Sequence, residues 1–202
     1  MSLTSVTDKA AVNCGFFYLP ICIEMNTDSN QRKRCFPPVV NADTRVLILG
    51  SLPGEASLAA GQYYAHPRNQ FWPLVGSLLQ LDLPALPYAQ RLGCLLQHGI
   101  GLWDVIAEAR RHGSLDTSIR DSQHNDLQQL LASLPKLALV AFNGKTAGKQ
   151  ATSLAGCGVA TLILPSSSPA FTLPFAAKQA AWRALASYIP TPRSDNRAAD
   201  QA

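Results

Sequence analysis

Four short apolar runs constrain the fold of this chain more than any other feature of its sequence. They cover residues 45–50, 99–106, 137–142 and 159–164, and the second is the least regular of them. Runs of this length without polar alternation are typical of strands buried on both faces, as in a parallel sheet. The sequence therefore predicts a four-stranded parallel sheet that is covered on each side.

Segments with helical periodicity fill the gaps between these runs. Glycine, proline or a helix-capping residue bounds each of them. The predicted helices cover residues 69–80, 87–98, 124–134, 145–154 and 174–189. Alternating strands and helices indicate crossover connections, and hence an α/β fold in one domain, which suits 202 residues of 47% apolar composition.

Both ends of the chain differ from this central part. Residues 1–35 precede the first periodic element and are predicted to be a poorly ordered extension, and residues 190–202 form a polar, disordered tail. The domain itself then covers residues 36–189. Arg32, Lys33 and Arg34 form a basic cluster that either contacts a polyanion or, as is more usual for such runs, is a solvated tail.

Composition limits the compartment and the partners of the protein. Its five cysteines are odd in number, lie far apart and include no C-x-x-C pair, which indicates reduced thiols in a cytoplasmic protein without a metal site. The apolar stretch at residues 10–23 is too short to span a bilayer, so no membrane association is expected. A formal net charge of +4 permits a polyanionic partner without requiring one.

Three of the four apolar runs lead into loops of unusual composition. These loops are Gly-Ser-Leu-Pro-Gly at residues 50–54, Asn-Gly-Lys-Thr at 143–146 and Pro-Ser-Ser-Ser-Pro-Ala-Phe at 165–171. Ligands of open α/β sheets bind at the carboxyl ends of the strands. If the three loops converge there, they form the functional site.

Two common enzyme classes fit these loops poorly. The Gly-Lys-Thr at residues 144–146 lacks the preceding glycine of a phosphate-binding loop, because Leu139 occupies that position. A serine hydrolase could use Ser167 with His66 and Asp104, but the G-x-S-x-G elbow is absent. Acyl hydrolysis through Ser167 therefore stays a minor alternative.

The same loops contain what an enzyme needs to act on an extruded nucleobase. Such an enzyme requires an aromatic ring for stacking, a polar group that holds water, phosphate contacts and an apolar wedge that fills the gap in the duplex. The blocks GSLPGEASL (residues 50–58), QYYAHPRNQFW (62–72) and LPSSSPA (164–170) together resemble the hypoxanthine-DNA glycosylases of the uracil-DNA glycosylase superfamily. They are also similar to the mismatch-specific uracil-DNA glycosylases, and the resemblance covers residues 36–189.

The resemblance implies a three-layer fold around a four-stranded parallel sheet, with no metal and no cofactor. It also implies a monofunctional enzyme that hydrolyses the N-glycosidic bond of a deaminated base in DNA: hypoxanthine first, with uracil or xanthine as further candidates. A monomer is expected. The alternative is a non-catalytic nucleic-acid-binding protein of the same fold.

One departure from the mismatch-specific pattern decides which residue is expected to be catalytic. Those enzymes have an asparagine in the first block, where this chain has Leu52, whose aliphatic side chain cannot orient water. In the hypoxanthine-removing family the asparagine of the His-Pro-x-Asn block is implied to serve catalysis, and it corresponds to Asn69. Its amide would position the attacking water, whereas its other role would be to cap the helix that follows.

The remaining site predictions assign a base pocket and a DNA contact. Tyr64 is expected to stack on the base, with Tyr63 as the alternative, and Asn143 either reads the base edge or forms a turn. Phe171 is expected to be the wedge rather than a core residue. The predicted pocket consists of Ser51, Leu52, Gly54, Tyr64, His66 and Asn143, and the predicted DNA contact consists of Ser166, Ser167, Ser168, Pro169, Ala170 and Phe171.

Overall fold

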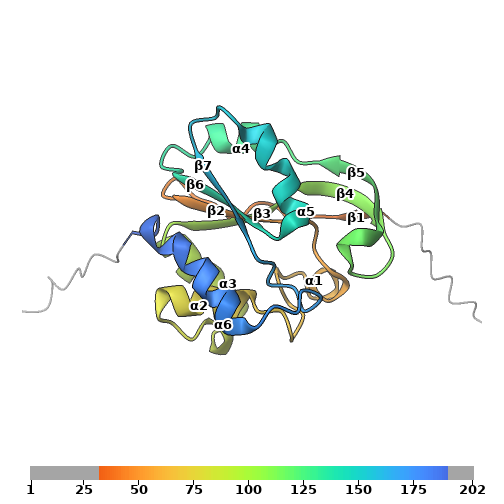
Figure 1. The fold of residues 1–202 in the computed structure, drawn as a ribbon, viewed down its shortest axis with the longest axis horizontal. Coiled ribbons are helices and arrows are strands. Elements are labelled where there is room, and N and C mark those ends of the chain that lie inside the picture. Colours follow the sequence, from red (N-terminus) through yellow and green to blue (C-terminus); the bar gives the residue numbers. More distant parts are fainter. Residues whose placement is uncertain (1–31, 191–202) are drawn as a thin grey trace, which may run out of the picture.

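The computed structural model describes residues 32–190, and its centre is a four-stranded parallel sheet (Figure 1). The strand order is β3-β2-β6-β7, and each neighbouring pair is parallel. The strands are β2 (Val46–Gly50), β3 (Ile100–Asp104), β6 (Leu139–Asn143) and β7 (Ala160–Leu164). The predicted four-stranded parallel sheet and α/β fold are confirmed.

Strand β2 is buried along its whole length, which explains its unbroken apolar sequence. Because successive side chains point to opposite faces of a sheet, β2 supplies both layers of the core. Val46 and Ile48 pack with Phe71 on one face, while Leu47 and Leu49 pack with the residues of the other face. A charged residue at any of these positions would lie in an apolar layer.

Helices cover both faces of the sheet. α2, α3 and α6 lie on one side, and α4 and α5 lie on the other (Figure 1). The helices are α1 (Glu55–Ala60), α2 (Phe71–Leu79), α3 (Tyr88–Gln97), α4 (Leu127–Ala132), α5 (Lys145–Gly148) and α6 (Phe175–Trp182). Five of these match predicted helices, with α5 and α6 ending in 3-10 turns, and α1 was not predicted. No helix of the part described is long and apolar enough to cross a membrane.

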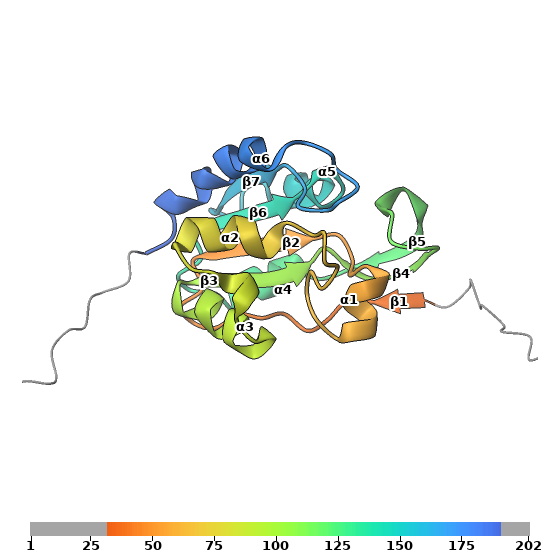
Figure 2. The same ribbon diagram turned by 90° about the horizontal axis from the view of Figure 1, so that it is seen from below.

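A second, antiparallel sheet was not predicted. Its order is β1-β4-β5, formed by β1 (Arg32–Arg34), β4 (Ile106–Arg111) and β5 (Ile119–His124), and it extends beyond α1 in Figure 2. The predicted strand at residues 99–106 was too long, because the chain leaves the parallel sheet at Val105. Periodicity missed β5 because most of its residues are polar and exposed.

The basic cluster at residues 32–34 is a strand, so its interpretation as a solvated tail was wrong. Arg32 and Arg34 both donate to the Glu108 carboxylate, at 2.7 and 3.0 Å, and the three residues pair with β4. Lys33 forms an ion pair with Glu55. The ordered domain therefore includes β1, while the rest of the predicted extension and tail, residues 1–31 and 191–202, lies outside the described residues.

Two truncations should distinguish the contribution of β1 to stability from that of the residues before it. Removing residues 1–35 deletes β1 and exposes the edge of β4, so we expect it to lower stability by on the order of 1 kcal/mol, or about 2–4 °C in Tm. Removing residues 1–30 retains β1 and should leave Tm unchanged. A variant with Arg32→Ala and Arg34→Ala controls for the ion pairs alone. Equal melting temperatures for the two truncations would contradict a stabilising role of β1.

Candidate active site

The three unusual loops lie together at the carboxyl edge of the parallel sheet. The Gly144 amide donates to the Leu164 carbonyl at 3.0 Å, which joins the loops after β6 and β7. The Gln70 amide donates to the Ser167 carbonyl at 3.0 Å, which attaches the loop before α2. Gly144 has a φ of 103°, and a Cβ there would lie 3.0 Å from the Ser166 Cβ, so this junction requires glycine.

The first loop, residues 50–54, is held by hydrogen bonds from the antiparallel sheet. Arg111 of β4 is buried, and its guanidinium donates to the carbonyls of Leu52 and Pro53. Ser51 donates its hydroxyl to Asp116 at 2.7 Å. Burial lowers the pKa of the Arg111 guanidinium, although the nearby carboxylates oppose this shift. The antiparallel sheet thus fixes the position of the loop.

Two residues of this loop have roles other than lining a pocket with their side chains. Leu52 is 5% exposed and packs with Leu49 and Val105 in the core, so its side chain is part of the core in the free protein. Gly54 is the N-cap residue of α1 at a φ of −72°, so its backbone does not require glycine. A Cβ at Gly54 would lie 3.3 Å from the Ser114 hydroxyl.

The adjacent tyrosines are directed differently. Tyr63 is 3% exposed and belongs to the core, which removes it as the stacking residue. Tyr64 has a φ of 56°, an uncommon conformation for a bulky residue, and its ring stacks on Phe71 with centroids 3.9 Å apart. Its hydroxyl is buried and makes no hydrogen bond of normal geometry within residues 32–190, although the nearby Asn143 side chain lowers its pKa against the larger, opposite effect of burial. Strain of this kind persists where surrounding structure enforces it and is frequent at functional sites.

Asn69 lies in a tight turn that leads into α2. Its Oδ1 accepts the Phe71 amide at 3.0 Å, and its own amide donates to the His66 carbonyl at 2.8 Å. The His66 Nδ1 accepts the Arg68 amide at 3.1 Å, so His66 shapes the same turn. No hydrogen bond among the described residues includes the Asn69 Nδ2. The N-cap residue of α2 is Gln70, so the predicted alternative of Asn69 as the helix cap is wrong; the Asn69 side chain closes the turn before the helix and keeps its Nδ2 donor available.

Asn143 and Ser167 form a reciprocal pair. The Asn143 Nδ2 donates to the Ser167 hydroxyl, and its Oδ1 accepts the Ser167 amide, both at 2.8 Å. Ser167 is completely buried, so in this state it contacts neither a phosphate nor an acyl substrate, contrary to its predicted place in the DNA contact. Asn143 therefore serves first to hold the loop after β7.

The rest of that loop is more accessible. Ser166 and Ser168 accept backbone amides of the loop itself, Pro169 is half-buried, and Ala170 is exposed. Phe171 is 41% exposed, which is the arrangement expected of a wedge and not of a core residue. The buried Lys178 donates to the Phe171 carbonyl at 2.7 Å. This lysine, which sequence analysis did not assign, fixes the loop from α6.

Asp104 is the polar residue of the site that sequence analysis left without a role in base excision. It ends β3 opposite Gly50, is 3% exposed, and its Oδ2 has no hydrogen-bond partner within residues 32–190. Burial raises the pKa of its carboxyl to about 7, against the opposing effect of Arg111. A lone aspartate at the end of an apolar run was the only signal in the sequence.

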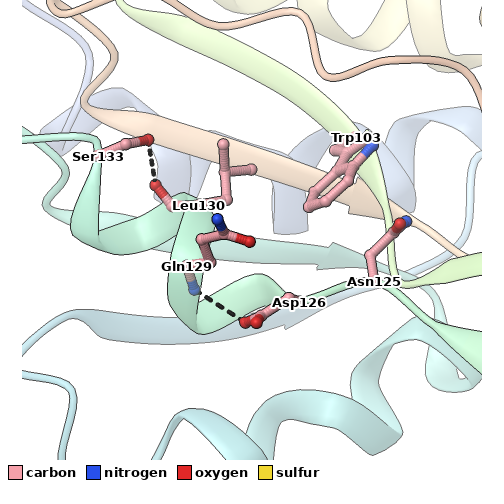
Figure 3. A pocket seen from close by; sticks show the side chains of 6 residues that line it. All are labelled: Trp103, Asn125, Asp126, Gln129, Leu130 and Ser133. Carbon is pink, nitrogen blue, oxygen red and sulfur yellow. Dashed lines mark hydrogen bonds between the residues drawn. The ribbon is translucent and has the colours of Figure 1, made fainter.

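A separate open hollow of about 460 Å³ lies beside α4. Its lining residues are Trp103, Asn125, Asp126, Gln129, Leu130 and Ser133 (Figure 3). None of the predicted site residues lines it. Within residues 32–190, no three His, Cys, Asp or Glu side chains are placed to hold a metal ion.

Comparison with known proteins agrees with this fold and shows the family. The sequence profile of the uracil DNA glycosylase superfamily matches residues 37–186, and the chain belongs to this superfamily. The chain is 43% identical over 151 residues to a hypoxanthine DNA glycosylase of Methanosarcina barkeri, which spans 75% of this chain and 96% of the relative. It is 45% identical over 138 residues to a hypoxanthine DNA glycosylase of Methanosarcina acetivorans, which spans 68% and 87% respectively.

A solved structure shows the same fold. It is the solution NMR structure of a Methanosarcina acetivorans protein described as a uracil DNA glycosylase, and it superposes with a TM-score of 0.70 at 41% identity. The match covers 77% of this chain and 96% of the other. The predicted resemblance to this superfamily, and to its hypoxanthine-removing members, is confirmed.

Gly50→Ala should destabilise the protein, because Gly50 lies at the centre of the site. A Cβ at Gly50 would lie 2.5 Å from the Asp104 Oδ1, so we expect a loss of about 1–3 kcal/mol in the free energy of unfolding. Gly93→Ala in α3 is the control, since a Cβ there meets nothing within 4 Å and alanine favours a helix. Urea unfolding measures both variants.

Adding Asp104→Ala to Gly50→Ala removes the clashing oxygen and should recover part of the loss. Equal stability of Gly50→Ala and Gly93→Ala would show that Asp104 does not lie against the end of β2.

Proposed function

We propose that this protein is a hypoxanthine-DNA glycosylase that extrudes deoxyinosine from a duplex and hydrolyses its N-glycosidic bond. The observation that carries the proposal is the assembly of Asn69, Tyr64 and Phe171 at one sheet edge, within the region matched by the hypoxanthine DNA glycosylases of Methanosarcina. Water adds to C1′ of the sugar, and the base leaves with the electron pair of the broken C1′–N9 bond. The products are free hypoxanthine and an abasic site.

In this proposal, Asn69 positions the attacking water. Its Oδ1 holds the Phe71 amide with one lone pair, so the second lone pair and the two Nδ2 hydrogens can orient a water molecule. Closing the turn before α2 and holding water are therefore compatible. The bond to the Phe71 amide also fixes the side chain in one orientation, as catalysis by positioning requires.

Tyr64 and Phe171 act on the base and on the gap that it leaves. The Tyr64 ring provides the aromatic surface next to the first loop, while the accessible Phe171 enters the stack of the duplex. Ser166 and Ser168, which are only partly buried, supply the phosphate contacts that Ser167 cannot make. The partner is therefore DNA that contains a deaminated base.

The deciding experiment measures release of free hypoxanthine from a duplex with one deoxyinosine. We expect release together with an alkali-labile abasic site. Binding of that duplex without any release would instead support the non-catalytic alternative, which the apolar Leu52 in the first loop favours. Labelling by a fluorophosphonate would support an acyl hydrolase, and we expect none because Ser167 is buried.

Asn69→Ala should reduce single-turnover excision about 100-fold or more, the scale lost with one preorganised polar group. It should also cost about 1 kcal/mol of stability through loss of the hydrogen bond from the Phe71 amide. Asn69→Asp is the matched control, because a carboxylate still accepts the Phe71 amide and binds water. We expect it to keep the stability and part of the activity. Wild-type excision by folded Asn69→Ala would leave Asn69 only its role in the turn before α2.

Phe171→Ala should slow excision from duplex DNA more than from single strands, where no stack has to be opened. Stability should change little because the ring is 41% exposed. Ile163→Ala serves as the control, since Ile163 is 52% exposed on β7 and lies outside the three loops. The same loss on duplex and single-stranded substrates would contradict a wedge.

A further inference from the structure

Two buried polar groups, the Asp104 carboxyl and the Tyr64 hydroxyl, lie against the same glycine at the centre of the site. From the position of a Cβ on Gly50, the Asp104 Oδ1 is 2.5 Å away and the Tyr64 hydroxyl 3.2 Å. The Asp104 Oδ2 and the Tyr64 hydroxyl are both buried and unpaired within residues 32–190. Buried polar atoms are nearly always hydrogen-bonded in folded proteins, so this pair indicates a position where a ligand supplies the missing partner.

Asp104 has no structural task that would explain its burial. Arg111 is the cation that acts on the pKa of Asp104, but its guanidinium donates to the backbone carbonyls of Leu52, Pro53 and Gly113. No ion pair of the described residues includes Asp104. A carboxyl that only supported the fold would be paired when buried this deeply.

The surroundings of Asp104 favour its protonated form. The charged or titratable groups that face it are Arg111, Asp116, Tyr63, Tyr64 and Cys35. Burial raises its pKa to about 7, Asp116 acts in the same direction, and Arg111 opposes them. Burial also raises the pKa of both tyrosines and of the Cys35 thiol, so these neighbours stay neutral near pH 7. A proton donor is thus available beside Tyr64.

A purine benefits from such a donor when it leaves. As the C1′–N9 bond breaks, negative charge develops on the base, and a proton placed on a ring nitrogen such as N7 neutralises it. We propose that Asp104 is a catalytic residue, the general acid that protonates hypoxanthine at N7 as it departs. This inference rests on the proposed glycosylase activity. The proton moves from the carboxyl to N7, water adds to C1′, and the proton lost by that water returns to Asp104 through solvent.

Because the Asp104 Oδ2 is buried in the free protein, a neighbouring group has to move before the base can reach it. The proposal also explains why Gly50 has no side chain, since any Cβ would separate the carboxyl from the loop.

The test compares the wild-type protein with Asp104→Asn in single-turnover excision of hypoxanthine from pH 5 to 9. An acid must be protonated to act, so the wild-type rate should be constant at low pH and fall as pH rises through about 7. Asp104→Asn should be at least about 100-fold slower at pH 6 and should lack this decline. A wild-type rate that rises toward pH 7 would make Asp104 a base, and an unchanged variant profile would exclude it from catalysis; either outcome overturns the proposal.

The affinity of Asp104→Asn for an uncleavable duplex distinguishes a role in proton donation from a role in recognising the base. With a duplex carrying 2′-fluoro-deoxyinosine, whose glycosidic bond resists cleavage, Asp104→Asn should bind within about threefold of wild type, far less than the loss of rate. A fall in affinity as large as the fall in rate would show that Asp104 only recognises the base.

Folding of the variant is checked by its melting temperature. The folded pKa of Asp104 lies above the usual value of 3.8, so its burial costs stability as pH rises from about 4 to 7. Asp104→Asn should therefore melt at or above the wild-type temperature at pH 8. If the wild-type protein itself releases no hypoxanthine, the proposed function fails, whereas release with an indifferent Asp104→Asn refutes only the role of Asp104.

Discussion

The close approach of Asp104 and Tyr64 to Gly50 is the constraint on which the site depends. β2 is buried on both faces, so its end is fixed within the sheet, and the lack of a side chain at Gly50 lets two polar groups reach its backbone. A sheet with a looser centre could not hold these groups to within tenths of an ångström. The same strand, β2, thus forms the centre of the apolar core and ends at the polar site.

The loops around this point are held from outside the parallel sheet. Arg111 ties the first loop to the small sheet, the Asn143–Ser167 pair ties the third loop to β6, and Lys178 ties it to α6. Each anchor is a polar side chain that bonds to loop backbone or to a loop hydroxyl, and two of them, Arg111 and Lys178, are buried. These contacts restrict the loops before DNA binds, which reduces the cost of ordering them later, although access to the buried Asp104 carboxyl still requires a local movement.

Sequence reasoning predicted the parts of the molecule that depend on local pattern. Apolar runs gave the four parallel strands because strands buried on both faces have no polar alternation. The same criterion missed β5, whose polar residues are mostly exposed, and β1, whose arginines are paired with Glu108.

Sequence reasoning anticipated that the three loops lie at one edge of the sheet, but not how their side chains are oriented. The three loops after β2, β6 and β7 meet, yet Leu52 and Ser167 point into the protein. Ser167 does so because of Asn143, which is 24 residues away in the chain. The isolation of the Asp104 carboxyl is likewise a tertiary property, since the nearby Arg111 donates to loop carbonyls instead.

A crystal structure of the protein bound to a duplex with 2′-fluoro-deoxyinosine would test the account most directly. We predict that hypoxanthine lies out of the helix beside Tyr64, with Asn69 near C1′, Asp104 facing N7 and Phe171 in the gap of the duplex. A base that remains stacked in the duplex, or that lies in the hollow between Trp103 and α4, would contradict the assignment of this sheet edge as the active site.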